Sequence, residues 1–383
     1  MHADQPLAWP AGAARTGASD GGGEEAVHRW QREFRKRAGD ALAAFVGDRC
    51  AEHVRSVPAE HLVGELLGEY AVGGKYLRPT FAYLGWLAGG GDDNEAAVRA
   101  AASTELLHAF ALLQDDVMDR SPTRRGLPAA HLRLAGWYRD QALPGDAHRF
   151  GESAAILLSD LCLVWAGQML RESGLSRESL DRAWPYYDLL RGELAVGQLA
   201  DLVYDARTRP GLAEVLDMSR RKSGNYTVRR PLELGAAMAG GDAVVLRVLG
   251  VYGELVGEAF QLRDDLLGVF GEPSVTGKPN GGDLRERKAT SVVVLAAEMA
   301  TASQREELNR LAASARLSED DIDRWRGVAE STGVINRVER MIDVRVARAR
   351  DSLESAAAEG APLDAFAASA LRDLAVSATG RAW

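Results

Sequence analysis

The chain has 383 residues, 46% of them hydrophobic, and a formal net charge of −9 at pH 7. This length allows one large domain or two smaller ones, and the acidic balance argues against general nucleic-acid binding. The two cysteines, Cys50 and Cys162, lie far apart in sequence and lack metal-ligand spacing. They fit small core residues of a protein in the reducing cytoplasm.

The N-terminal segment, residues 1–26, is rich in Gly, Ala, Ser and Asp and contains three consecutive glycines. This composition predicts a disordered tail. No basic region followed by an apolar region is present, so we expect no secretory signal. No later stretch reaches the roughly 18 uninterrupted apolar residues that a membrane span requires, so we expect no such span.

Helical periodicity begins at Val27 and continues through the chain, since apolar residues recur at three- and four-residue spacing. Strand signals are weak, and no linker separates two regions of different composition. We therefore predict an all-α fold in which residues 27–383 form a single large helical bundle. The strongest helical segments are Ala96–Asp119, Leu180–Tyr204, Val244–Phe270 and Ile335–Ala358, and the expected interruptions are residues 88–93, 121–127, 143–150 and 271–283.

Gly73 and Gly74 begin a segment that reads as a loop entering a helix. Glycines allow close approach to the backbone, and Lys75 and Arg78 follow three residues apart. The pattern fits an anion site near a helix N-terminus. A plain helix start would have the same pattern.

A first cluster of aspartates, Asp115, Asp116 and Asp119, follows an apolar helical run. Asp115 and Asp119 are four residues apart and share a helix face, and Asp116 flanks them. Like charges this close raise each other's pKa, and a divalent cation such as Mg²⁺ would remove the repulsion. A solvated acidic helix end is the alternative, which the apolar run before the cluster disfavours.

Three basic or polar residues accompany this cluster. Arg124 and Arg125 follow it, and guanidinium groups bind phosphate oxygens bidentately. They could equally form salt bridges with the aspartates. His108 lies seven residues before Asp115 on nearly the same helix face, so it is either a core histidine or points into the same cavity.

A second aspartate pair occurs far along the chain, at Asp264 and Asp265. The surrounding basic residues, taken singly, read as surface cations. Together with the two aspartate clusters, they predict two anion pockets around one metal site. The further candidates are Gln198, Asp201, Lys222, Ser223, Gln261, Lys278, Asp283 and Lys288.

From about Gly74 to Thr290 the chain resembles the trans-isoprenyl diphosphate synthase family, the short-chain polyprenyl synthases. Asp115-Asp116-x-x-Asp119 with Arg124-Arg125-Gly126 resembles the first aspartate-rich motif of that family. Gln261-x-x-Asp264-Asp265 with Gly277-Lys278 and Asp283 resembles the second. Order and spacing both agree, which chance acidic runs would not produce.

The resemblance implies a helical bundle around a central cavity, of the isoprenoid synthase type. It implies a Mg²⁺-dependent prenyltransferase that joins an allylic diphosphate to isopentenyl diphosphate by ionisation, condensation and elimination. It also implies three Mg²⁺ ions per active site and a homodimer. The departures from the family pattern concern substrate detail and remove no carried-over ligand; they are Gln114, Pro122, Leu127, Asn225, Arg229 and Gly268.

The resemblance also assigns roles to the candidate residues. The metal ligands would be Asp115, Asp116, Asp119 and Asp264, supported by Asp265. The allylic diphosphate would be held by Arg124, Lys222, Ser223, Gln261, Lys278 and Lys288. Isopentenyl diphosphate would be held by Lys75, Arg78, His108 and Arg125. Supporting polar residues would be Gln198, Asp201 and Asp283.

Product length in the family depends on the helix below the first aspartate cluster. Ala111 lies four residues before Asp115, about 6 Å deeper at roughly 1.5 Å per residue, and leaves space there. Phe110 adds one bulky ring. This pattern resembles that of relatives with C20 products, so we predict geranylgeranyl diphosphate, with farnesyl diphosphate (C15) as the alternative. Phe110 could also be an ordinary core residue.

Two other classes of function are open to such a chain. A class I terpene cyclase shares the architecture, but it usually has an Asn/Ser/Glu metal triad where this chain has Asp264-Asp265. A catalytically silent synthase subunit should have lost one aspartate motif, and this chain retains both.

Overall fold

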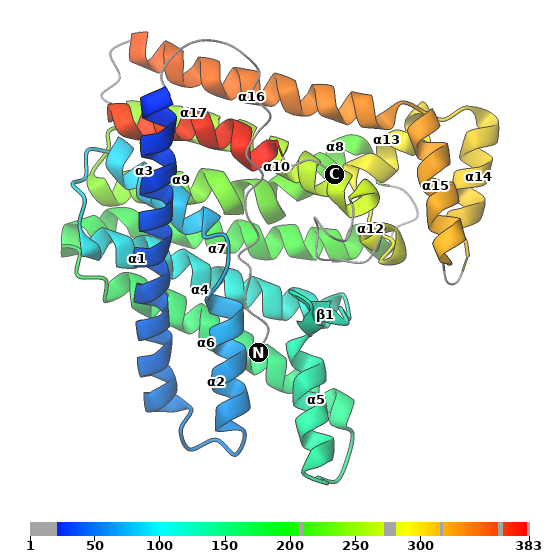
Figure 1. Ribbon diagram of the computed structural model, residues 1–383, viewed down its shortest axis with the longest axis horizontal. Helices are drawn as coiled ribbons and strands as arrows, with labels where there is room; N and C mark the ends of the chain where they lie inside the picture. Colours follow the sequence, from blue (N-terminus) through cyan, green and yellow to red (C-terminus); the bar gives the residue numbers. More distant parts are fainter. Residues whose placement is uncertain (1–20, 207–209, 272–280, 315–316, 359–362, 381–383) are drawn as a thin grey trace.

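The computed structural model describes residues 21–206, 210–271, 281–314, 317–358 and 363–380. These residues are almost entirely helical (Figure 1), as predicted, apart from one two-stranded antiparallel hairpin. The elements are α1 (Gly21–His53), α2 (Glu60–Ala71), α3 (Leu77–Ala88), α4 (Glu95–Met118), β1 (Thr123–Arg124), β2 (Leu127–Pro128), α5 (Ala130–Asp140), α6 (Ala147–Arg171), α7 (Arg177–Ala206), α8 (Leu212–Ser219), the π-helix η1 (Arg220–Arg229), α9 (Arg230–Ala239), α10 (Ala243–Phe270), α12 (Gly282–Arg285), α13 (Ser291–Met299), α14 (Ala302–Ala312), α15 (Glu319–Ser331), α16 (Val334–Ala358) and α17 (Ala365–Thr379).

The four helices predicted most strongly are confirmed as α4, α7, α10 and α16. Some of the predicted boundaries differ from those in the structure. Helix α1 already begins at Gly21, so residues 21–26 of the predicted tail are helical, since extending an existing helix through glycine costs only about 1 kcal/mol per residue. Helix α6 begins at Ala147, inside a predicted interruption, because Asp146 caps it by accepting hydrogen bonds from the amides of His148 and Arg149.

The long helices α4, α6, α7, α10 and α16 run across the molecule in the view of Figure 1, and α1 crosses them. Helix α4 packs along α6, α10 packs along α16, and η1 lies against both α7 and α10. The β1–β2 hairpin follows directly after α4. The first aspartate cluster lies at the C-terminal end of α4, and Lys222 lies in the first turn of η1.

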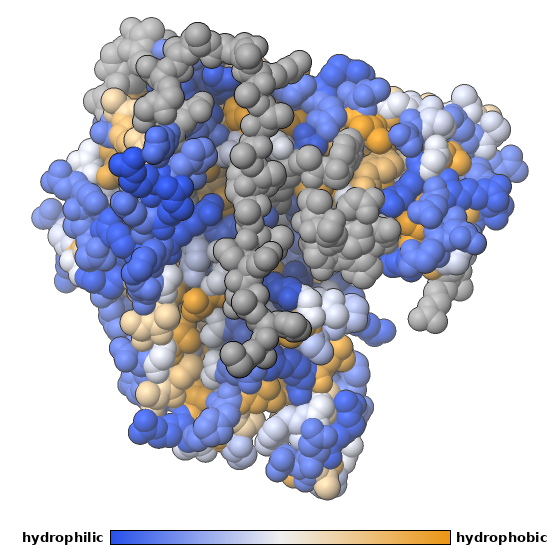
Figure 2. Space-filling model, in the orientation of Figure 1, coloured by the Kyte–Doolittle hydropathy of each residue, from blue (hydrophilic) through white to orange (hydrophobic). Residues whose placement is uncertain are grey.

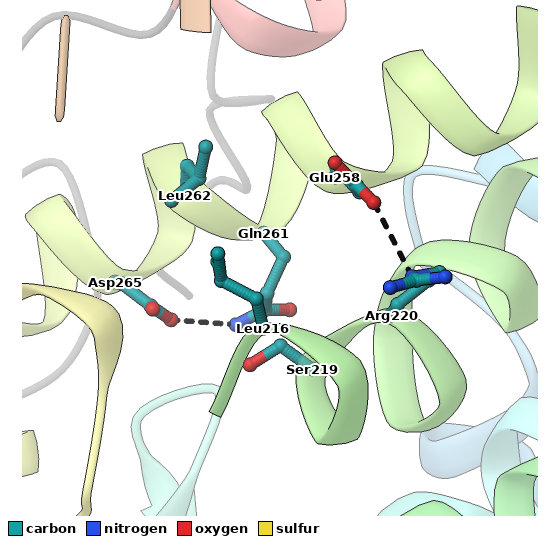
Figure 3. A pocket seen from close by; sticks show the side chains of 7 residues that line it. All are labelled: Leu216, Ser219, Arg220, Glu258, Gln261, Leu262 and Asp265. Carbon is teal, nitrogen blue, oxygen red and sulfur yellow. Dashed lines mark hydrogen bonds and ion pairs between the residues drawn. The ribbon is translucent and has the colours of Figure 1, made fainter. Parts of the chain in front are cut away.

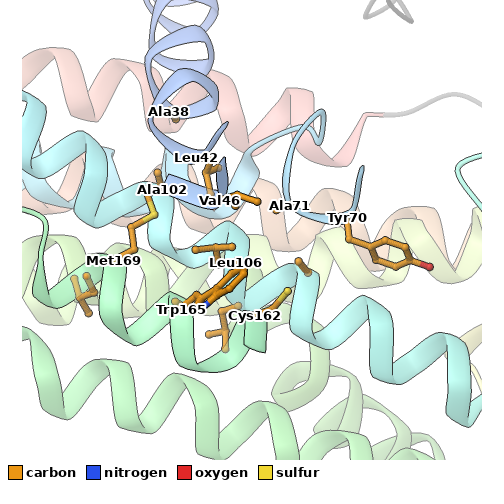
Figure 4. Packing of buried hydrophobic residues seen from close by; sticks show 14 of the residues in the cluster. Ala38, Leu42, Val46, Tyr70, Ala71, Ala102, Leu106, Cys162, Trp165 and Met169 are labelled. Atoms are coloured by element: carbon orange, nitrogen blue, oxygen red, sulfur yellow. The ribbon is translucent and has the colours of Figure 1, made fainter. Parts of the chain in front are cut away.

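Helix α4 is the centre of the largest hydrophobic core. Asn94 caps its start by accepting a hydrogen bond from the Ala97 amide, and most of its length is buried. Leu106 packs there with Leu42 of α1 and Trp165 of α6 (Figure 4). Burying one such side chain contributes about 1.5–3 kcal/mol, so this core holds the end of α4 rigidly.

Helix α10 lies between two further hydrophobic cores. Its first half contributes Leu249 and Val256 to a core with α3, α9 and α17. Its second half contributes Leu262 and Leu266 to a core with α13, α15 and α16. A helix held on both sides in this way is a firm support for the aspartate pair near its C-terminus.

Two helices, α4 and α6, are long and apolar enough to cross a membrane by length and composition alone. Two-thirds of the apolar window of α4 and half of that of α6 are buried inside the molecule, as in core helices. The face in Figure 2 is mostly hydrophilic, with hydrophobic surface in the lower half of the view, over the region of α2, α5 and α6.

Candidate active site

The last turn of α4 carries aspartates at the negative end of the helix dipole. Asp115 and Asp116 lie in the last turn, and Asp119 is the C-cap residue. Negative charge is unfavourable at a helix C-terminus. Compensating cations therefore have to come from other elements of the fold.

Two lysines provide most of this compensation. Lys222 of η1 lies 3.4 Å from Asp115 Oδ1 through its Nζ atom and also donates a hydrogen bond to Asp201 of α7. Lys288 Nζ donates to Asp119 Oδ2 at 2.7 Å and lies 2.9 Å from Glu286 Oε2. Lys288 follows the second aspartate pair in sequence, so this contact brings the segment after α10 to the end of α4.

The charges at the end of α4 influence one another strongly. Burial alone would raise the pKa of Asp115, but Lys222, Lys288 and Arg124 outweigh burial and lower that pKa. Burial and the charge of Asp115 raise the pKa of Asp119 despite Lys288. The carboxylates in turn raise the pKa of both lysines against the effect of burial. These groups therefore titrate together, as a coupled set.

Asp116 has different partners from its neighbours and is only 1% exposed. Its Oδ2 atom accepts a hydrogen bond of 2.7 Å from the Tyr70 hydroxyl of α2. Its Oδ1 atom accepts one of 3.0 Å from Arg124 Nε, and Arg124 Nη2 donates to the same oxygen. The structure therefore engages Asp116 in a buried ion pair instead of grouping it with Asp115 and Asp119.

The position of Lys222 depends on close contact between η1 and α7. A Cβ atom added at Gly197 would lie only 2.5 Å from the Lys222 amide nitrogen, so any larger residue would push the π-helix away. Ser223 is half-buried beside Lys222. Gln198 donates a hydrogen bond of 3.7 Å to Met118 Sδ at the end of α4. Helix α7 thus holds η1 and α4 together at the site.

The two aspartates of α10 differ in exposure. Asp265 is buried, and its carboxylate accepts hydrogen bonds from Gln261 Nε2 at 2.8 Å (Figure 3) and from the Ser291 hydroxyl and amide at 2.6 and 3.0 Å. Asp264 is exposed. Asp265 therefore ties α10 to α13, while Asp264 is the carboxylate accessible to a ligand.

Gly268 stands one helical turn after Asp264, where a third aspartate is absent. A Cβ atom at this position would lie 1.9 Å from Asp283 Oδ2. A side chain at position 268 is therefore incompatible with the observed position of Asp283. The carboxylate of Asp283 occupies the space that the missing side chain leaves beside α10.

A second group of polar side chains lies between α3, α4 and η1. The Arg78 guanidinium carbon lies 4.3 Å from the centre of the Tyr226 ring, and Arg78 Nη2 donates to Thr227 Oγ1 at 3.0 Å. The His108 ring centre lies 6.4 Å from that of Tyr226. Arg78 and His108, which were predicted to share one anion pocket, are therefore brought together.

Glu105 and Arg125 complete this second group beneath Gly74. A Cβ atom at Gly74 would lie 2.4 Å from Glu105 Oε1 and 3.4 Å from Arg125 Nη2. Burial raises the pKa of Glu105 against the effect of the arginines. Burial, with Arg78, Arg125 and Arg124, lowers the pKa of His108 well below its usual value, so the imidazole is neutral near pH 7.

Buried polar atoms without partners mark this second pocket as a place for a polar ligand. Arg78 Nε, Glu105 Oε2 and His108 Nδ1 are buried and have no hydrogen-bond partner among the residues that the structure describes. Such atoms are rare in folded proteins unless water or a ligand satisfies them. Lys75 is exposed and directly follows Gly74 in the chain.

A metal at the first cluster would need ligands from outside the protein. Within the described ranges, no three acidic, histidine or cysteine side chains are grouped so that they could hold an ion. Mg²⁺ usually binds through one or two carboxylates together with waters and substrate phosphates. The exposed and half-buried aspartates here fit that mode, because all their donor atoms are hard oxygens.

The sequence model of the family described as polyprenyl synthetase matches residues 60–326. The chain belongs to this family. This chain is 34% identical to geranylfarnesyl diphosphate synthase of Aeropyrum pernix over 302 residues, which cover 78% of this chain and 88% of the relative. It is 33% identical to geranylgeranyl diphosphate synthase of Mycobacterium tuberculosis over 74% of this chain and 75% of the relative.

Solved structures agree with this assignment. The polyprenyl synthase is similar to the geranylgeranyl pyrophosphate synthase of Corynebacterium glutamicum, crystallised with isoprenyl diphosphate and magnesium. The TM-score is 0.85 at 34% identity, over 91% of this chain and 99% of that one. The predicted all-α isoprenoid synthase fold and the prenyltransferase class are therefore confirmed. The alternative functions of a terpene cyclase and of a silent synthase subunit are therefore no longer supported. The relatives are named for geranylfarnesyl, geranylgeranyl and farnesyl products, so they do not fix the length of the product.

Several features of this polyprenyl synthase were absent from the sequence prediction. Tyr70 and Ser291 each contact one predicted aspartate but belong to no recognisable spacing. Glu105 could have been predicted, because it lies three residues before His108 on the same face of an apolar helix. Of the predicted residues, Lys278 lies outside the described ranges. Phe110 and Ala111 are half-buried and pack against the core around α4.

Proposed function

We propose that this polyprenyl synthase joins an allylic diphosphate to isopentenyl diphosphate and releases geranylgeranyl diphosphate as its main product. One observation carries the proposal: two separate groups of cations adjoin α4. One group, with Lys222, Lys288 and Arg124, surrounds the aspartates at the helix end. The other, with Arg78 and Arg125, surrounds His108 deeper in the helix. Two anionic substrates can therefore bind side by side.

The metal site, in this proposal, lies between α4 and α10. Asp115 and Asp119 would hold Mg²⁺ from one side and Asp264 from the other, with three ions in the complete site. Asp265 and Asp283 would support the α10 side. Asp116 was predicted from the sequence as a metal ligand, but because it pairs with Arg124 we assign it here to the support of that arginine. When bound, Mg²⁺ would stabilise the charge that builds up on the departing pyrophosphate.

The allylic diphosphate would be bound by Arg124, Lys222, Ser223, Gln261, Lys278 and Lys288. Lys222 and Lys288 would exchange part of their contact with Asp115 and Asp119 for phosphate oxygens. These cations are fixed in place before the carbon–oxygen bond breaks, so they can stabilise the leaving group without further reorganisation. The ionised allylic group would then lie among apolar side chains of α4, which exclude water.

Isopentenyl diphosphate would be bound by Lys75, Arg78, His108 and Arg125. The neutral imidazole of His108 can donate one hydrogen bond to phosphate without adding charge. This position would direct the double bond of isopentenyl diphosphate toward the allylic cation. Bond formation followed by loss of a proton to the released pyrophosphate would lengthen the chain by five carbons.

Product length, we propose, is limited along α4. Ala111 is one turn below Asp115, where a methyl group leaves room for a growing chain. Phe110 beside it would restrict the cavity to a product of about C20. Farnesyl diphosphate remains the alternative product, since it requires only one condensation fewer.

We also propose that residues 27–383 form one synthase domain, acting as a cytoplasmic homodimer. Helices α6 and α7 each expose a row of apolar side chains. Monomeric proteins rarely leave such rows uncovered, and a second copy of the chain would cover both. The side chains are Ile156, Leu157 and Val164 on α6, and Leu189, Val196, Leu199, Leu202 and Val203 on α7.

Removal of single carboxylates tests the metal site. Asp115→Ala or Asp264→Ala should lower kcat at least about a hundredfold, because metal stabilisation of charge contributes several kcal/mol. The exposed Asp320 of α15 offers a control, since Asp320→Ala should leave turnover unchanged. Turnover that persists in both site variants, or in excess EDTA, would contradict the proposal.

A further inference from the structure

The last turn of α2 supports the hairpin that carries both arginines. Arg125 Nη1 donates hydrogen bonds to the carbonyl oxygens of Glu69 at 2.7 Å and Val72 at 3.1 Å. Tyr70 stands between these two residues and is 4% exposed. Its hydroxyl accepts a hydrogen bond of 3.1 Å from the amide of Ala130, the first residue of α5. The segment between α4 and α5 is thus attached to α2 at several points.

Tyr70 also reaches the end of α4. The same hydroxyl that accepts from Ala130 donates to Asp116 Oδ2 at 2.7 Å. Asp116 Oδ1 accepts hydrogen bonds from Nε and Nη2 of Arg124, and Nε also donates to Oδ2 at 3.2 Å. Tyr70, Asp116 and Arg124 therefore form one continuous chain of hydrogen bonds from α2 to β1.

The orientation of Arg124 has a competitor close by. Arg124 Nη2 lies 4.0 Å from Asp115 Oδ2, so a small rotation would move the guanidinium from Asp116 to Asp115. Asp116 prevents this by engaging one edge of the guanidinium, which leaves the opposite edge for phosphate. Without the Tyr70 hydroxyl, Asp116 Oδ2 would keep only the longer hydrogen bond of 3.2 Å from Arg124 Nε, so the carboxylate would be held less firmly.

We infer that Tyr70 is a positioning residue for the allylic diphosphate. Its hydroxyl fixes Asp116, and Asp116 in turn holds one edge of Arg124, which turns the opposite edge toward the diphosphate and keeps Arg124 away from Asp115. The inference rests on the proposed role of Arg124 in binding this substrate. The effect of Tyr70 should concern the allylic diphosphate alone. Arg125, which is assigned to isopentenyl diphosphate, is held by backbone carbonyls that do not depend on the Tyr70 hydroxyl.

Tyr70→Phe is the decisive variant, and Tyr252→Phe is its matched control. Tyr252 is also buried, and its hydroxyl donates to the Leu371 carbonyl at 2.6 Å in a core formed by α10 and α17. We expect Tyr70→Phe to raise the KM for the allylic diphosphate about tenfold, as the loss of one hydrogen bond to a charged group implies. The KM for isopentenyl diphosphate should change in neither variant.

A binding measurement without turnover provides a second readout. Calorimetric titration with inorganic pyrophosphate and Mg²⁺ should show about tenfold weaker binding in Tyr70→Phe and unchanged binding in Tyr252→Phe. Asp116→Asn should reproduce the Tyr70→Phe result, and it replaces that variant if the latter folds poorly. Equal weakening in Tyr70→Phe and the control would overturn the inference.

A double-mutant cycle with Arg124→Gln distinguishes the two possible failures. If Tyr70 acts through Arg124, Tyr70→Phe should add nothing to the defect of Arg124→Gln. Full additivity of the two defects would overturn the inference and leave the role of Arg124 intact. An unchanged allylic KM in Arg124→Gln alone would instead overturn the proposed role of Arg124.

Discussion

Asp264 and Asp265 are neighbours in sequence, yet burial gives them different tasks. Asp265 is enclosed and accepts three hydrogen bonds from Gln261 and Ser291, whereas Asp264 faces solvent. A buried acid of this kind favours its neutral form unless its hydrogen bonds offset desolvation. The pair therefore combines one structural carboxyl group with one that can receive a ligand.

The stability of the metal-free protein should reflect the burial of Asp265. Burial raises the pKa of Asp265 to about 6 from 3.8, although Ser291 and Gln261 oppose the change. Between about pH 4 and pH 6 the folded chain thus binds more protons than the unfolded chain, and stability falls as pH rises. Relative to the natural protein, Asp265→Asn should gain up to about 3 kcal/mol in unfolding free energy from pH 4 to pH 7. Urea unfolding in EDTA measures this gain, and an equal difference at both pH values would contradict it.

His108 should act as a neutral hydrogen-bonding group. Burial and the nearby arginines lower its pKa well below the usual value, so we expect the imidazole to meet the substrate in its neutral form. His108→Gln keeps a neutral donor and acceptor and should change the KM for isopentenyl diphosphate less than about threefold. His108→Ala should raise it about tenfold. Steady-state kinetics at a saturating concentration of the allylic substrate measures this KM. A KM in His108→Gln as high as that in His108→Ala would refute the prediction.

At the scale of elements, the proposed function makes α4 the link between the chemistry and the length of the product. Its C-terminal turn carries the aspartates, and Phe110 and Ala111 lie on the turns below. Ala111→Phe should fill the space below Asp115 and shift the main product toward C15, while Phe110→Ala should shift it toward C25. Chromatography of the dephosphorylated products measures both. An unchanged product distribution in Ala111→Phe would mean that this residue does not line the cavity.

Local sequence was sufficient for the long helices but insufficient for η1 and the hairpin. The apolar spacing that marks α4, α7, α10 and α16 is a property of each segment alone. The π-helix depends on close packing against α7 at Gly197 and against α10, where a Cβ on Gly257 would lie 2.5 Å from the Gly224 carbonyl oxygen. Contacts of this type join segments that are distant in sequence, so no local pattern reports them.

The site was predictable where charges recur at helical spacing and unpredictable where one residue acts alone. Asp115 and Lys222, which were predicted to lie in one site, form an ion pair, and Asp119 forms another with Lys288. Tyr70 was missed because a tyrosine on an amphipathic helix ordinarily indicates core packing. The Asp116–Arg124 ion pair was foreseen only as an alternative to phosphate binding.

At the scale of the whole molecule, the exposed rows on α6 and α7 predict a dimer. Val164 of α6 is 64% exposed. Val164→Asp should place a charge in the interface and convert dimer to monomer in sedimentation velocity, with the helical circular dichroism retained. Val344 of α16 is 55% exposed and gives a control, because Val344→Asp should remain dimeric. A monomeric natural protein, or dissociation of both variants alike, would contradict the proposed interface.

Product analysis of the purified protein tests the central claim most directly. The protein would be supplied with isopentenyl diphosphate, Mg²⁺ and, in turn, dimethylallyl, geranyl and farnesyl diphosphate. The two-anion site with an open position at Ala111 predicts that geranylgeranyl diphosphate dominates and that EDTA abolishes its formation. A dominant C10 or C15 product would contradict the chain-length proposal. Absence of any condensation product would contradict the assignment of the two cation groups to two diphosphates.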